Sequence, residues 1–170
     1  MDFDVISLMI SIIALLISAF TFVLWTKERN RPVKETPAGE STKPLQLQAY
    51  ERLVMLTERI SIPNLVSRAN QSGLASAKEM QILLLESIKQ EFEYNSSQQI
   101  YVSPVAWESV KNLKEQNMLI INQIASSLPA EARAIDLNKA LLDFIMGQQK
   151  GALHSIVLEA LNYEARKLMK

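Results

Sequence analysis

The sequence predicts an all-α protein, in which one N-terminal transmembrane helix is followed by a flexible linker and a soluble bundle of about five helices. Three observations lead to this fold class. Residues 5–25 form an uninterrupted apolar run, and from residue 45 onward apolar side chains recur every three or four positions, which is the period of an amphipathic helix. Helix-forming residues dominate the composition, whereas Gly occurs only 4 times, so helix is favoured over sheet.

The apolar run has the length of a membrane span. No charged residue lies between Asp4 and Lys27. At a rise of 1.5 Å per residue, about 21 residues cross roughly 30 Å, the thickness of the hydrocarbon core. A cleaved signal peptide would begin with basic residues and have a shorter apolar stretch, but this chain begins with Met-Asp-Phe-Asp. We therefore expect residues 5–25 to be a permanent anchor.

The charges beside the run predict its orientation. Acidic residues precede it and basic residues follow it: Asp2 and Asp4, then Lys27, Arg29, Arg31 and Lys34. Because basic flanks stay on the cytoplasmic side, residues 1–4 are expected outside and residues 26–170 in the cytoplasm. The chain has no cysteine, which agrees with a compartment where proteins do without disulfides.

Small side chains line one face of the expected span. Their spacing alternates between four and three residues: Ser7, Ser11, Ala14, Ser18 and Thr21. In lipid, small residues let two helices approach closely and hydroxyls can bond across the contact, so this seam predicts weak homo-oligomers. The alternative is that the hydroxyls bond only to the backbone of their own helix.

Residues 26–44 are predicted to be a flexible linker, because they are rich in charge and proline and show no apolar period. The soluble domain then spans residues 45–170. Its first helix carries apolar side chains at Leu45, Ala49, Leu53, Leu56 and Ile60. Pro63 marks the start of a short helix, which Gly73 ends.

Capping signals locate the next two helices. Ser76 and Glu79 form a capping-box pattern, so a helix is expected from there to about Asn95. Residues 100–102 are expected to be extended. Ser103 as N-cap and Pro104 as first residue then begin the longest helix.

Two further helical segments complete the expected bundle. One runs from Pro129 to the glycines at Gly147 and Gly151, and Asp136 would divide it in two if it were an internal N-cap. The last helix is expected from about Ala152 to the C-terminus.

The sequence shows no recognisable catalytic, cofactor-binding or metal-binding residues. His154 is the only histidine, so the paired Glu-x-x-His motifs of a di-metal bundle are absent, and His154 is interpreted as a boundary side chain. There is no P-loop and no dinucleotide-binding glycine motif. Lys and Arg together number 18, as do Asp and Glu, and this balance argues against nucleic acid as a partner.

One loop stands out as a candidate docking segment. Gln98, Gln99 and Tyr101 precede Trp107, and amide and aromatic side chains of this kind are common in protein interfaces. The alternative is structural, with Ile100, Val102 and Trp107 fixing a crossing loop to the core.

Several stretches resemble an uncharacterised family of small bacterial membrane-anchored helical proteins. They are the segment from Tyr50 to Pro63, "IKQEFEYNSSQQIYVSPVAWESVKNLK" from Ile88 to Lys114, "DLNKALLDFIM" and "ALHSIVLEALNYEARKL". The resemblance implies a location in the bacterial inner membrane, and it implies no activity or cofactor.

These features predict a membrane-anchored cytoplasmic interaction or scaffold module with a protein partner. The alternatives are a membrane-associated enzyme with a carboxylate-based site and a regulatory subunit of a membrane complex. A concave pocket lined by converging carboxylates or by Asn and Gln would favour an enzyme, and an exposed apolar patch would favour the module.

Overall fold

A computed structural model describes residues 18, 20–22, 26, 38–147 and 153–170. Contacts divide the chain into residues 1–41 and residues 42–170. In the described ranges the regular structure is helical and no strand forms, which confirms the all-α class. The expected anchor and most of the expected linker lie largely outside the described residues. Among the residues that are described, no helix is both long and apolar enough to cross a membrane.

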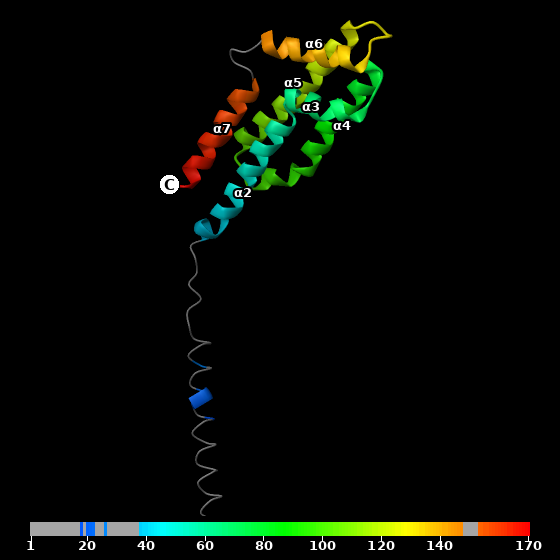
Figure 1. Ribbon diagram of the computed structural model, residues 1–170. Helices are drawn as coiled ribbons and strands as arrows, with labels where there is room; N and C mark the ends of the chain where they lie inside the picture. The colour runs from blue at the N-terminus through cyan, green and yellow to red at the C-terminus, as the bar shows by residue number, and fades with distance from the viewer. Residues whose placement is uncertain (1–17, 19, 23–25, 27–37, 148–152) are drawn as a thin grey trace, which may run out of the picture. The chain divides into compact units, whose positions relative to one another are not determined.

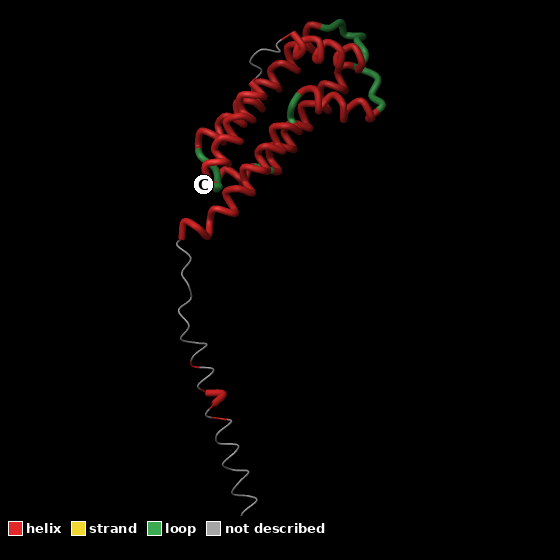
Figure 2. Tube along the Cα trace, turned by 60° about the vertical axis from the view of Figure 1, so that its left-hand side comes forward, coloured by secondary structure: helices red, strands yellow, loops and turns green. Residues whose placement is uncertain are grey.

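The second unit is a bundle of helices of unequal length (Figures 1 and 2). In chain order the elements are α2 (Ala38–Arg59), α3 (Ile62–Ala69), η1 (Asn70–Ser72), α4 (Ala77–Tyr94), η2 (Ser96–Ile100), α5 (Pro104–Ser127), α6 (Ala134–Gly147) and α7 (Leu153–Leu168). Figure 1 shows α4, α5 and α7 running along the domain and α6 crossing one end of it. The five longer helices agree with the expected number, and α3 is the expected short one.

Helix α2 begins earlier than expected. It starts at Ala38, inside the range predicted as linker, and it continues through Pro44. Pro44 has no N–H to donate to the preceding turn, which explains why the sequence pattern places the helix start after it. Residues 42–45 are exposed and burial begins at Ala49. Residues 42–45 of α2 are therefore helical without belonging to the core.

The predicted caps are confirmed. Gly73 ends η1 with a φ of 69°, a left-handed conformation that favours glycine. The Ser76 hydroxyl accepts a bond from the Glu79 N–H at 3.2 Å, and the Glu79 carboxylate accepts one from the Ser76 N–H at 3.2 Å. Hydrogen bonds from Ser76 also lower the pKa of Glu79. At α5, the Ser103 hydroxyl accepts from the Ala106 N–H at 3.1 Å.

Two local predictions are wrong. Residues 100–102 are not an extended segment, because the Tyr101 N–H donates to the carbonyl of Gln98 at 3.0 Å and the chain continues the turns of η2. Asp136 is not an N-cap. It lies in the first turn of α6, where its carboxylate accepts from the Arg133 guanidinium at 3.2 Å and from the Arg133 N–H at 3.0 Å. These bonds lower the pKa of Asp136, and α6 runs undivided from Ala134 to Gly147.

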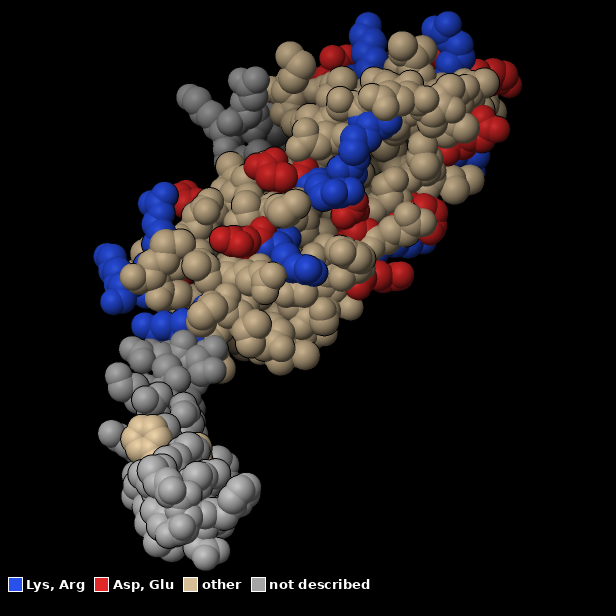
Figure 3. Space-filling model, turned by 60° about the horizontal axis from the view of Figure 1, so that its bottom comes forward, with Lys and Arg blue, Asp and Glu red and all other residues tan. Residues whose placement is uncertain are grey.

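Charged side chains of both signs are interspersed on the face of the molecule shown in Figure 3. Glu86, Lys89 and Glu91 of α4 belong to this surface: Lys89 pairs with Glu86 at 2.8 Å, and Glu91 with Arg59 of α2 at 2.6 Å. Exposed pairs of this kind contribute at most about 1 kcal/mol each. The bundle must therefore be stabilised chiefly by its interior.

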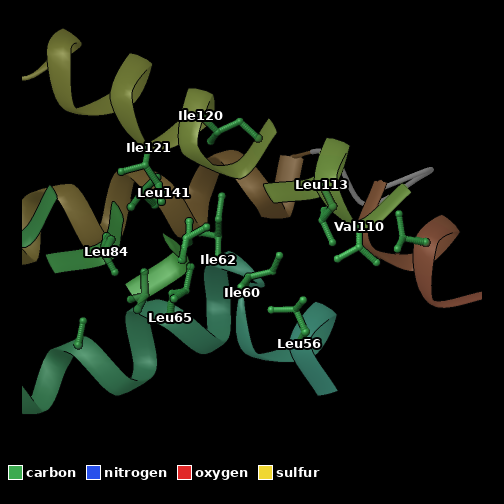
Figure 4. Packing of buried hydrophobic residues seen from close by; sticks show 14 of the residues in the cluster. Leu56, Ile60, Ile62, Leu65, Leu84, Val110, Leu113, Ile120, Ile121 and Leu141 are labelled. Atoms are coloured by element: carbon green, nitrogen blue, oxygen red, sulfur yellow. The ribbon is translucent and has the colours of Figure 1, made fainter. Parts of the chain in front are cut away.

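The core draws on every α-helix of the domain (Figure 4). Its largest fully buried side chains are Leu53, Leu56, Ile60, Leu65, Val66, Leu84, Ile88, Leu113, Ile121, Leu137, Leu141 and Leu161. Trp107 is only half-buried, and it packs against Phe92 with 5.0 Å between the ring centroids. Leu45, which the sequence pattern places on the apolar face of the first helix, is exposed, and Phe144 of α6 is exposed as well.

Candidate functional site

The predicted docking residues lie on η2 and directly after it. Gln98 is half-buried, while Gln99 and Tyr101 are exposed. The side-chain amide of Gln98 donates to the Ser97 hydroxyl at 3.2 Å, and that of Gln99 donates to the carbonyl of Ser96 at 2.9 Å. The structure thus brings the three side chains onto one short segment.

Two exposed aliphatic side chains, Ile100 and Val105, lie in or near the same segment. Ile100 is 74% exposed and Val105 is 70% exposed, although both are aliphatic. Ile100 therefore does not fix the loop to the core, whereas Val102 and Trp107 are half-buried and pack against it. We name this set of exposed and half-buried residues, Gln98, Gln99, Ile100, Tyr101 and Val105, the η2 edge. A sequence signal does exist for it, since no charged residue lies between Glu93 and Glu108.

A hydrogen-bonded cluster holds the η2 edge in place. The Tyr50 hydroxyl donates to the Glu164 carboxylate and accepts from the Ser103 N–H at 3.1 Å. The Ser103 hydroxyl also donates to Glu164, at 2.6 Å. Burial raises the pKa of Tyr50, and the bond to Glu164 raises it further. This cluster joins α2 and α7 to Ser103, the N-cap of α5, which lies between Tyr101 and Val105 of the η2 edge.

A cavity of about 300 Å³ lies among α2, α3, α5, α6 and α7. We name it the His154 pocket. Its walls are largely apolar, with Ile62, Pro63, Leu113, Ile120, Ile145 and Leu153, and its polar lining consists of Glu58, Ser61, Asn64, Gln116, Asn117 and His154. These residues are widely separated in the sequence, so the pocket had no local sequence signal.

Two polar side chains of the His154 pocket, His154 and Asn64, lie near the carboxylate of Glu58. The Nε2 atom of His154 lies 3.5 Å from Oε2 of Glu58, beyond ordinary hydrogen-bond distance, and this buried nitrogen makes no hydrogen bond. The Asn64 amide donates to the carbonyl of Glu58 at 2.8 Å and reaches its Oε2 at only 3.4 Å. The Asn117 amide donates to the carbonyl of Ile60 at 2.8 Å. His154 is thus half-buried, as expected, but it faces a pocket.

The predicted transmembrane seam is described only in part. Ser7, Ser11 and Ala14 lie outside the described residues. The Thr21 hydroxyl donates to the carbonyl of Ser18 at 2.9 Å, which is the kind of local bond that the alternative interpretation requires. Over the described part of the chain, no group of His, Asp and Glu side chains is arranged to hold a metal ion.

Comparison with known proteins gives one match. The model of a family described as "Family of unknown function (DUF7935)" matches residues 2–168, so the chain belongs to that family. This confirms the resemblance to an uncharacterised family. No curated protein and no solved structure matches the chain.

Proposed function

We propose that this DUF7935 member is a single-pass protein of the bacterial inner membrane that holds a helical domain in the cytoplasm, where the η2 edge binds a partner protein. The observation that carries the proposal is the η2 edge itself, which combines uncharged sequence with exposed aliphatic and aromatic side chains. Aromatic side chains and a lack of charge distinguish the centre of a protein interface from the rest of a surface.

The membrane part of the proposal rests on the sequence. The apolar run at residues 5–25 and the basic residues after it support an anchor with residues 1–4 outside. Residues 26–44 then form the tether, whose last part continues into α2, and residues 45–170 form the cytoplasmic domain. The seam from Ser7 to Thr21 supports weak homo-oligomers within the membrane.

The docking part rests on how the η2 edge is held. Ile100 and Val105 present apolar surface that a partner would remove from water, and burial of such surface is favourable by about 25 cal/mol per Å². The cluster of Tyr50, Ser103 and Glu164 fixes the backbone next to this surface. A surface that is already ordered loses less conformational entropy on binding, which favours affinity.

Photocrosslinking in native membranes tests the docking surface. We expect a photoreactive phenylalanine at Ile100 of the full chain to give one discrete adduct with another protein. Val105→Glu should abolish that adduct, because it places a charge in the apolar contact. The matched control is the same probe at Ile135 on α6, which is 62% exposed and should give no such adduct.

Three results would overturn the docking assignment. They are the same adduct from Ile135, an adduct of only two copies of this chain, and adducts with lipid alone.

A further inference from the structure

We infer that the His154 pocket binds a small organic amine, with the protonated amine at Glu58 and His154 and the apolar body against the wall of Ile62, Leu113 and Ile120. This site is separate from the η2 edge, and the inference does not depend on the docking proposal.

The size and walls of the pocket define the body of the ligand. Its volume of about 300 Å³ is roughly twice that of a cavity that accepts benzene, which leaves room for one ring and a short chain. Ile62, Leu113 and Ile120 are buried in the core, and they offer an apolar surface. Ligand sites typically combine such walls with a few converging polar groups.

The charge of the pocket lining determines which polar group a ligand can carry. Glu58 is the only carboxylate among the lining residues, and none of them is Lys or Arg. An anionic ligand would therefore meet a negative charge and no fixed positive charge. A protonated amine would instead form a charge-assisted hydrogen bond with Glu58, which is among the stronger hydrogen bonds in proteins.

The geometry places the two polar atoms close enough for one amine nitrogen, lying beside the pair, to contact both. The Nε2 atom of His154 and Oε2 of Glu58 are 3.5 Å apart, so a single nitrogen can lie within hydrogen-bond distance of both. The Nε2 atom is buried without a partner, and a neutral imidazole can offer it as an acceptor. An ammonium group has three donors, so it can satisfy both atoms at once.

The test uses the full chain in lipid nanodiscs, with isoleucine methyl groups labelled for NMR. Three probes share one ring and differ in the head: 2-phenylethylamine, 2-phenylethanol and 3-phenylpropionate. We expect the amine to shift the methyl signals of Ile62 and Ile120 but not that of exposed Ile82. The alcohol should bind about tenfold more weakly, and the carboxylate should cause no shift.

Variants test the two polar groups. Glu58→Gln should weaken amine binding by about tenfold and leave the binding of the alcohol unchanged, because it removes the charge and keeps the shape. Glu58 is half exposed, so this variant should fold. Glu115→Gln makes the same change on α5 outside the pocket and should not affect binding. His154→Leu should weaken binding severalfold.

Three outcomes would overturn the inference. They are the absence of pocket shifts with millimolar amine, equal binding of the carboxylate, and full amine binding by a folded Glu58→Gln variant.

Discussion

Replacing Leu84 with alanine is expected to lower the free energy of unfolding of the helical domain by about 2–5 kcal/mol. Leu84 lies on α4 and is 1% exposed, and its side chain belongs to the cluster shown in Figure 4. The substitution removes buried methyl groups and leaves a cavity that close-packed neighbours fill only in part. Because domains are stable by only about 5–15 kcal/mol, this loss is a large share of the total.

Chemical denaturation of the full chain in detergent, followed by circular dichroism, measures the change. Leu119→Ala on α5 is the matched control, since Leu119 is 50% exposed and its truncation should cost well under about 1 kcal/mol. Similar losses at the two positions would show that Leu84 does not lie in a packed core.

Tyr50→Phe is expected to cost about 1–3 kcal/mol, although it removes a single oxygen. The Ser103 N–H would lose its acceptor and the Glu164 carboxylate would lose one donor, while the ring would still fill its place in the core. Tyr163→Phe is the control, because Tyr163 is 61% exposed on α7. Equal stability of the Tyr50→Phe variant and the parent would mean that the cluster does not join the helices.

The pH dependence of stability gives an independent check on Tyr50. Its pKa is raised on folding, chiefly by burial, so the folded state binds this proton more tightly than the unfolded state. The protonated Tyr50 hydroxyl therefore adds to the free energy of unfolding below its unfolded pKa of about 10. This contribution is lost as the pH rises through the pKa of Tyr50 in the folded state. We expect the parent to lose more stability above pH 10 than Tyr50→Phe does.

Features set by neighbouring residues were predictable from the sequence. The bond between Ser76 and Glu79, the start of α5 at Pro104 and the left-handed Gly73 each depend on a few adjacent positions. Propensity alone was misleading at Ile100. An aliphatic residue there suggested an extended segment, but β propensity reflects packing against a neighbouring strand, and no strand forms in the described residues.

The candidate sites depend on contacts that no local pattern contains. Tyr50 and Glu164 are 114 positions apart in the sequence. Glu58 and His154 are also distant in the sequence, and the sequence alone supports only the interpretation of His154 as a boundary residue. The fold places the two side chains 3.5 Å apart. The η2 edge was identified from its amide and aromatic side chains, while its two most exposed apolar side chains, Ile100 and Val105, required the structure.

Proteolysis of oriented membranes tests most directly whether the chain holds a folded domain in the cytoplasm. Inverted inner-membrane vesicles expose the cytoplasmic face, so a protease should cut between Thr26 and the first turns of α2 and release a soluble, helical fragment of about 125 residues. In intact spheroplasts the same protease should release nothing. Release from spheroplasts but not from inverted vesicles would contradict the topology, and a protein that washes off untreated vesicles would contradict the anchor.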